Sequence, residues 1–328
     1  MSAQLVTVAL SLTEAISTFI AYKRALNRGY VTEEKALQLM GRALAEQNVA
    51  ALGAVTPSMI DAFLRSRSHR QPRSYNHLLG VVHRFFEWAV LHGHLEHNPV
   101  QADTRPRGSA RRPYLFDTDE VRRLLALARA LPDRPKGRHR ALVYETAFAL
   151  LFALGLRVGE VSRLRLGDVD LEQRVLTIRE SKFYKSRLVP FGPRIAARLQ
   201  RYVDQRHPGE RDPGIPLFSF TRRGCVCPEA ISMTFHALWP KLGLTIAAGV
   251  SAPRLHDLRH SFAVATLLRW YREGVDPNAR LFHLSTFMGH VDPSSTAVYL
   301  TITEQLLAQA DARFRSHALP RIGVGEPR

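Results

Sequence analysis

Apolar residues recur at spacings of three and four along most of the chain, and this periodicity restricts it to a mainly helical fold. Only residues 174–180 and 187–191, separated by a short polar turn, have the pattern of a β-hairpin. The sequence therefore predicts a mainly α (α+β) protein with a small antiparallel sheet. The predicted helices cover residues 75–98, 117–128, 141–155, 196–202, 229–242, 256–272, 278–288 and 292–300.

An arginine-rich segment without apolar periodicity separates the helix over 75–98 from those that follow. Its sequence is Thr104-Arg-Pro-Arg-Gly-Ser-Ala-Arg-Arg-Pro113. We expect a linker over residues 104–115 that joins two domains, over 1–103 and 116–328. The arginines of the linker, which include Arg111 and Arg112, have two interpretations. They clamp a nucleic-acid duplex between the domains, or they belong to a plain flexible tether.

The chain carries 46 Lys and Arg against 29 Asp and Glu, a formal net charge of +17 with neutral histidine. Because 45% of the residues are hydrophobic and only 23% charged, the excess cations decorate folded domains and are not a disordered tail. This balance predicts a polyanionic partner. Residues 65–73 concentrate four arginines, which form a phosphate-binding loop or a solvated surface loop: Arg65, Arg67, Arg70 and Arg73.

Several classes of protein are disfavoured. The most apolar stretch, residues 141–156, contains Glu145 and is too short to span a bilayer, which argues against an integral membrane protein. Residues 1–19 lack the cationic start of a secretory signal, so we expect a cytoplasmic protein. The only cysteines, Cys225 and Cys227, are too close for an ordinary disulfide and lack the second pair of a zinc site, so free thiols are expected.

His256 and Arg259 lie three residues apart at the start of a predicted helix, where one anion can reach both. Arginine offers a planar charged fork for two phosphate oxygens, and histidine exchanges a proton near neutral pH. The segment His256-Asp-Leu-Arg-His260 also fits a two-histidine zinc motif, with His283 or His290 as a third ligand. Arg259 weakens that interpretation, since a permanent cation among the ligands opposes a dication.

Three further segments carry candidate polar groups. In Leu154-Gly-Leu-Arg157-Val-Gly-Glu160 an arginine follows a helix-ending glycine, and Glu160 lies one turn on to orient it. The hairpin turn holds Glu180-Ser-Lys182-Phe-Tyr-Lys185, whose lysines can swing toward a ligand. Gly289-His290 precedes a helix start at Asp292-Pro293, and Tyr299 follows two turns later. A lone tyrosine is commonly structural, but a tyrosine together with these arginine, lysine and histidine residues points to phosphate chemistry.

In this order and spacing, the segments between residues 155 and 299 resemble those of tyrosine recombinases of the phage integrase family. The match includes the lysine of the hairpin turn followed by Arg187-Leu-Val-Pro190. The earlier Phe85-Phe-Glu-Trp88 and Asn98-Pro-Val100 are more loosely similar to the family's core-binding domain. The resemblance implies a helical, SAM-like core-binding domain and a mixed α/β catalytic domain that together form a C-shaped DNA clamp.

The resemblance also implies a division of labour among the polar residues. Tyr299 would be the nucleophile that forms a 3′-phosphotyrosyl link and frees a 5′-hydroxyl. Arg157 and Arg259 would hold the non-bridging phosphate oxygens and stabilise the charge of the transition state. Lys182 would protonate the departing 5′-oxygen, and it is favoured over Lys185 because the family's lysine directly follows the first strand.

The histidines have implied roles as well. His256 would assist proton transfer from the phenol, whose ordinary pKa of about 10 makes it a poor nucleophile at neutral pH. His290 would donate a hydrogen bond to the phosphate. We expect no cofactor and no metal, since the sequence has no obvious carboxylate cluster suited to magnesium.

The implied function is site-specific recombination of double-stranded DNA, as the integrase, transposase or resolvase of a mobile element. A homotetramer or a mixed recombinase tetramer would act on two duplexes. The alternatives are a type IB topoisomerase-like relaxing enzyme and a catalytically silent DNA-binding regulator of the same fold. The tail after Tyr299 docks on a neighbouring protomer or packs on its own domain, through Leu306, Leu307, Ala310 and Phe314.

Overall fold

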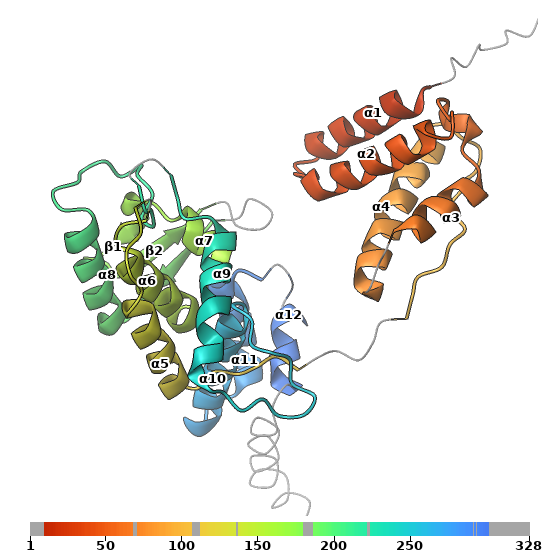
Figure 1. Ribbon diagram of the computed structural model, residues 1–328. Helices are drawn as coiled ribbons and strands as arrows, with labels where there is room; N and C mark the ends of the chain where they lie inside the picture. Colours follow the sequence, from red (N-terminus) through yellow and green to blue (C-terminus); the bar gives the residue numbers. More distant parts are fainter. Residues whose placement is uncertain are drawn as a thin grey trace, which may run out of the picture. The chain divides into compact units, whose positions relative to one another are not determined.

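The chain divides into two compact units, Met1–Ala110 and Arg111–Arg328 (Figure 1). The division falls inside the segment 104–115 that the sequence predicts as a linker. The structure, a computed structural model, describes residues 10–67, 71–106, 112–135, 137–179, 186–221, 224–290, 292 and 294–301. No helix in this described part is long and apolar enough to cross a membrane.

The first unit is a cluster of helices around an aromatic core. Its helices are α1 (Leu12–Ala25), α2 (Val31–Ala45), the short 3-10 helix η1 (Leu52–Ala54), α3 (Pro57–Ser66) and α4 (Pro72–Leu91). Phe19 of α1 packs edge-on against Phe85 of α4, with the ring centroids 5.5 Å apart. Burial of such rings supplies the main driving force for packing α1 and α4 together.

Helix α4 is shorter than predicted at its carboxyl end. The prediction extended it to residue 98, whereas it ends at Leu91. Gly93 adopts a φ of +72°, and the backbone N–H of His94 donates to the carbonyl of Ala89 at 2.9 Å. This is a glycine-terminated helix end, in which a left-handed residue turns the chain back onto the last carbonyls.

The second unit combines a small sheet with helices, which confirms the predicted α+β class. Strands β1 (Val169–Asp170), β2 (Val175–Ile178) and β3 (Arg187–Pro190) form an antiparallel sheet in the order β1-β2-β3. The hairpin of β2 and β3 was predicted, and Leu176 lies opposite Val189 in its register. Strand β1 was missed because two residues are too few to show an alternation. A 3-10 turn, η2 (Leu166–Asp168), leads into it.

The longer helices of this unit lie close to their predicted positions. The capping box at the start of α5 is confirmed, since the Asp117 side chain accepts from the Glu120 N–H and Glu120 from the Asp117 N–H. The helices are α5 (Thr118–Arg129), α6 (Arg140–Ala153), α7 (Val158–Arg163), α8 (Pro193–Arg206), α9 (Pro228–Leu238), α10 (Asp257–Arg272), α11 (Pro277–Met288) and α12 (Ser294–Ala297), with 3-10 helices η4 (Trp239–Leu242) and η5 (Val298–Thr301).

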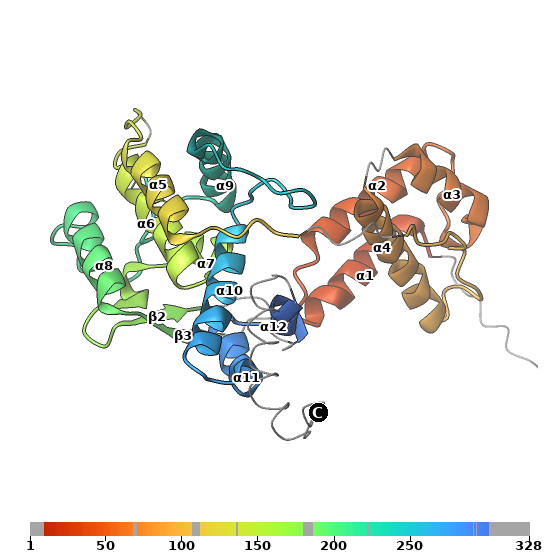
Figure 2. The same cartoon turned by 90° about the horizontal axis from the view of Figure 1, so that it is seen from below.

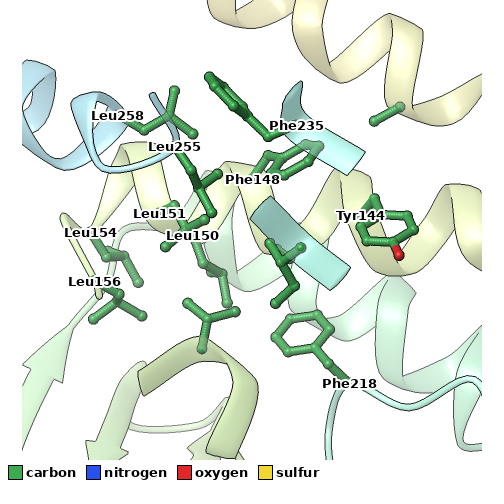
Figure 3. Close-up of a cluster of buried hydrophobic side chains, with 14 of the residues drawn as sticks. Tyr144, Phe148, Leu150, Leu151, Leu154, Leu156, Phe218, Phe235, Leu255 and Leu258 are labelled. Carbon is green, nitrogen blue, oxygen red and sulfur yellow. The ribbon is translucent and has the colours of Figure 1, made fainter. Parts of the chain in front are cut away.

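Helix α6 forms the centre of the main core, because it is buried on nearly every face. Phe148 and Leu151 of α6 face Phe235 of α9 and Leu258 of α10 (Figure 3). A second cluster joins α10, α11 and η5. Helices α10 and α11 lie side by side in both ribbon views (Figure 1, Figure 2). Packing α10 between these two clusters sets the position of the residues at its start, where the candidate site lies.

Gly155 ends α6 in a left-handed conformation, with a φ of +58°. A Cβ at this position would lie 2.4 Å from the ring of Phe262 on α10. We therefore expect Gly155→Ala to destabilise the chain by about 2–4 kcal/mol, from left-handed strain plus overpacking. The control is Gly209→Ala, where φ is +71° but no atom lies within 4 Å of the new Cβ. Equal urea midpoints for the two variants would contradict the packing argument.

Candidate active site

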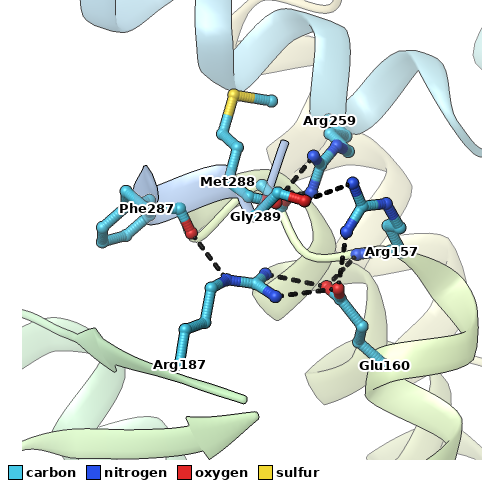
Figure 4. Close-up of polar contacts among 8 residues, drawn as sticks. Arg157, Glu160, Arg187, Arg259, Phe287, Met288 and Gly289 are labelled. Carbon is cyan, nitrogen blue, oxygen red and sulfur yellow. Dashed lines mark hydrogen bonds and ion pairs between the residues drawn. The ribbon is translucent and has the colours of Figure 1, made fainter. Parts of the chain in front are cut away.

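Three arginines converge on the carboxyl end of α11 (Figure 4). Arg187 of β3 donates to the carbonyl of Phe287, Arg259 of α10 to that of Met288, and Arg157 to that of Gly289, each at 2.8 Å. The last carbonyls of a helix have no partner within the helix and carry partial negative charge. This helix end therefore gathers guanidinium groups from three segments that are distant in the sequence.

Gly289 makes the close approach possible. It ends α11 with a φ of +69°, and a Cβ there would lie 2.7 Å from the Arg187 guanidinium. A larger residue at this position would both strain the backbone and displace an arginine. The glycine of the Gly289-His290 motif thus has a packing reason for its place beside the site.

Glu160 on α7 holds two of the arginines in place. Its carboxylate accepts from the side chain and backbone N–H of Arg157, at 2.8 and 2.9 Å, and from both terminal nitrogens of Arg187, at 2.9 Å each. Burial alone would raise the pKa of Glu160, but its hydrogen bonds and the charge of Arg187, then of Arg157, outweigh it and lower the pKa to about 2. Glu160 is therefore ionised at neutral pH, as the predicted orienting role requires.

Arg259 is the most buried of the three, with 1% of its surface exposed. Its guanidinium donates to the carbonyls of Gly155 and Met288. Burial, and then the charge of Arg157, lowers the pKa of Arg259 to about 9, so it remains a cation at pH 7. Because three arginines face one carboxylate, the site keeps an excess of positive charge that suits an anion.

Three histidines surround this charge, of which His256 is exposed and His260 and His290 are partly buried. His256 lies at the start of α10 with its ring 4.7 Å from that of His260, edge to face. His290 follows Gly289, and its Nδ1 forms a 2.6 Å hydrogen bond with the hydroxyl of Thr296. Burial, followed by the charges of neighbouring groups, lowers the pKa of each histidine to about 4. All three rings are therefore neutral at pH 7.

Tyr299 on η5 completes the cluster. Its side chain is buried, with 2% of the residue exposed, and its hydroxyl lies 2.8 Å from Nδ1 of His260. Burial raises the pKa of Tyr299, whereas the charges of Arg259 and Arg157 act to lower it. A phenol beside two guanidinium groups has the parts needed for nucleophilic attack on a phosphate.

The structure thus brings together six of the side chains predicted for the site, namely Arg157, Glu160, His256, Arg259, His290 and Tyr299. Two residues of this cluster had no predicted role in phosphate chemistry. Arg187 was only part of a matched motif, and His260 was part of another matched motif and a candidate zinc ligand. The four-residue spacing from His256 to His260, on one helix face, is the sequence signal for the second.

The other predicted residues belong to the first unit or to the start of the second, or they lie outside the described residues. Lys182, Lys185, Arg70, Arg111 and the tail residues fall outside them. Arg65 pairs with Asp61 at 3.5 Å, the Arg67 guanidinium lies over the Phe63 ring, and Arg73 is in the first turn of α4. The carbonyl of Arg112 accepts from the N–H of Ser251.

The zinc interpretation gains no support from the described part of the chain. No three histidine, cysteine, aspartate or glutamate side chains converge there in a way that could hold a metal ion. Arg259 donates to two backbone carbonyls beside His256 and His260, and its charge there opposes a dication.

The fold and this arginine–histidine–tyrosine cluster are typical of enzymes that cut and rejoin DNA through a tyrosine. The model of the phage integrase family matches residues 115–305, and the chain belongs to that family. It is a tyrosine-type site-specific recombinase.

Curated relatives carry matching descriptions. The chain is 36% identical over 262 residues to the putative integrase/recombinase y4rB of Sinorhizobium fredii. This alignment covers 79% of this chain and 83% of that protein. It is 28% identical over 262 residues to the tyrosine recombinase XerD of Lacticaseibacillus casei, over 76% of this chain and 79% of that protein.

Solved structures share the fold. A lambda integrase dimer bound to a COC′ core site superposes with a TM-score of 0.63 at 19% identity, over 87% of this chain and 97% of that chain. The Tn1549 transposon integrase in complex with a circular intermediate DNA has a TM-score of 0.64 at 15% identity, over 94% of this chain and 99% of that chain. At these identities the likeness concerns the fold alone.

Proposed function

We propose that the chain breaks and rejoins DNA strands through a 3′-phosphotyrosyl link to Tyr299, as a site-specific recombinase. The observation that carries this proposal is the convergence of Arg157 and Arg259 on one helix end, with the phenol of Tyr299 close enough for both charges to act on it. The new link is itself a phosphodiester, so rejoining needs no external energy source.

The two arginines bind the non-bridging oxygens of the scissile phosphate. A guanidinium has five N–H groups, and the hydrogen bonds to Glu160 and to backbone carbonyls use two in each arginine. We infer that the remaining N–H groups bind the phosphate. Because the carbonyls and Glu160 already hold both forks, little reorganisation is needed when charge develops in the transition state.

The remaining groups handle protons. His290 uses Nδ1 for Thr296, which leaves Nε2 to bond the phosphate. His256 assists proton transfer within the cluster, where its ring contacts that of His260. We assign protonation of the departing 5′-oxygen to Lys182, with Lys185 as the alternative.

The partners are double-stranded DNA sites and further copies of a recombinase. One solved relative is a lambda integrase tetramer bound to a Holliday junction, which supports assembly of this chain as a homotetramer or mixed tetramer. We assign residues 1–103 and the arginines Arg65, Arg67, Arg70, Arg73, Arg111 and Arg112 to DNA binding. The mobile-element role draws support from the transposon integrase among the structural relatives. We assign the enzyme to the cytoplasm, where it would meet its DNA.

The test uses nicked duplexes built from inverted repeats that flank the gene, since a nick lets the 5′-hydroxyl fragment diffuse away and traps the covalent intermediate. We expect an SDS-stable adduct that forms equally well with EDTA present, and a DNA-linked peptide that contains Tyr299. Recombinant product, in addition to relaxed circles, excludes the topoisomerase alternative. Binding to these duplexes without any adduct would favour the silent regulator, and an adduct at another residue would contradict the nucleophile assignment.

A further inference from the structure

The phenol of Tyr299 has a specific hydrogen-bond partner. Its hydroxyl lies 2.8 Å from Nδ1 of His260, and the two ring centroids are 5.4 Å apart. This distance is within the range at which a side chain can take a proton directly. The contact with His260 is the one hydrogen bond that the structure records for the Tyr299 hydroxyl among the described residues.

The other two histidines of the cluster are placed differently. The Nδ1 of His290 forms its hydrogen bond with Thr296, and the His290 ring lies roughly parallel to the phenol ring, with the centroids 6.4 Å apart. His256 contacts the His260 ring instead. His260 is therefore the histidine that meets the atom that attacks phosphorus.

The position of His260 is built into the arginine site. His260 and Arg259 are successive residues of α10, and Arg259 is clamped between the carbonyls of Gly155 and Met288. This clamp fixes the rotation of the helix start and therefore the direction of the next side chain. The histidine that holds the phenol and the arginine that binds phosphate are thus aligned by the same contacts.

The charges around His260 favour a neutral ring in the absence of DNA. It faces Arg254 in the segment before α10, His256 and Arg259 from its own helix end, and Tyr299 from η5. Burial and the two arginines lower the pKa of His260 to about 4. A neutral ring with its proton on Nε2 has a lone pair on Nδ1 for the phenol proton. A phosphate bound at Arg259 offsets the charge that suppresses protonation, so the basicity of His260 rises when substrate is present.

We propose that His260 is the general base that accepts the phenol proton during strand cleavage, a catalytic role that rests on the proposed nucleophile. The Tyr299 O–H bond breaks, its proton moves to Nδ1, and the oxygen attacks phosphorus. The bond from phosphorus to the 5′-oxygen breaks, and that oxygen takes its proton from the hairpin lysine. On rejoining, the 5′-hydroxyl gives its proton to the neutral hairpin lysine and attacks phosphorus, the bond from phosphorus to the Tyr299 oxygen breaks, and the imidazolium of His260 returns its proton to the leaving phenolate.

The test measures single-turnover adduct formation by the full chain on the nicked duplexes described above, with saturating protein. We expect His260→Ala and His260→Gln to lower the rate at pH 7 by about 10²–10⁴-fold, the usual contribution of general base catalysis. The glutamine variant keeps a hydrogen-bonding group beside the phenol but cannot carry the proton. We expect the residual rate to rise with pH and to be rescued by added imidazole in His260→Ala, neither of which a purely structural loss would produce. The matched control is His283→Ala on the exposed side of α11.

Each outcome separates this inference from the proposed function. A wild-type rate in His260→Gln, or a rate in His260→Ala equal to or above that of the wild type, would overturn the proposal. Either result would show that His260 only holds the phenol through a hydrogen bond and does not accept its proton. A slow variant with a flat pH profile and no rescue by imidazole would overturn it too. An adduct formed by Tyr299→Phe would instead remove the nucleophile assignment, whatever His260 does.

Discussion

Replacing Tyr299 with phenylalanine is expected to abolish the covalent protein–DNA adduct while changing the affinity for DNA by less than about twofold, or about 0.4 kcal/mol. The substitution removes one oxygen, and the ring still fills the cluster formed by α10, α11 and η5. The arginines proposed to bind phosphate keep their contacts with Glu160 and with the end of α11. What is lost is the nucleophile and a hydrogen bond to His260, which contributes about 1 kcal/mol to stability.

The adduct is measured on denaturing gels with the nicked duplexes, and affinity by gel shift with the same DNA. Tyr271→Phe provides a matched control, because Tyr271 lies on α10 and packs against the same cluster. We expect this control to form adduct at the wild-type rate. Adduct formation by Tyr299→Phe would show that another group attacks the DNA.

Substitution of Glu160 by glutamine is expected to produce the largest loss of stability, about 3–5 kcal/mol at pH 7. The carboxylate is 2% exposed and is the ion-pair partner of both Arg157 and Arg187. Glutamine has nearly the same shape but leaves two guanidinium groups without their counter-charge. We also expect slower cleavage, since Arg157 loses the group that orients it toward the phosphate.

The same carboxylate predicts how stability depends on pH. Because the pKa of Glu160 is about 2 in the folded chain and near 4.5 when unfolded, its ionisation stabilises the fold fully above pH 4.5. This contribution is lost as the pH falls from about 4.5 to about 2. The difference in urea unfolding free energy between wild type and Glu160→Gln should therefore shrink over that range. Glu273→Gln, which removes an exposed pair with Arg269, should change stability by less than about 1 kcal/mol. Equal losses in the two variants would contradict the importance of burial.

The sequence alone predicted the features that depend on local physics. The capping box at Asp117, the helix end at Gly155 and the β2–β3 hairpin follow from residues a few positions apart, and all are present. Local signals failed where they were short or competing. Strand β1 has only two residues, and the glycine turn at Gly93 ends α4 before the predicted end at residue 98.

The residue types of the candidate site could also be predicted from the sequence, because arginine, histidine and tyrosine seldom occur by chance in this order around a hairpin. Their contacts could not, because they join positions that are mostly far apart in the chain. Only packing of α10 and α11 against α6 and β3 places Arg187 on Glu160, Arg259 on the last carbonyls of α11, and His260 on the Tyr299 hydroxyl. The sequence by itself determined which groups are available, and the tertiary structure decided which of them meet, since burial and charge act through space and not along the chain.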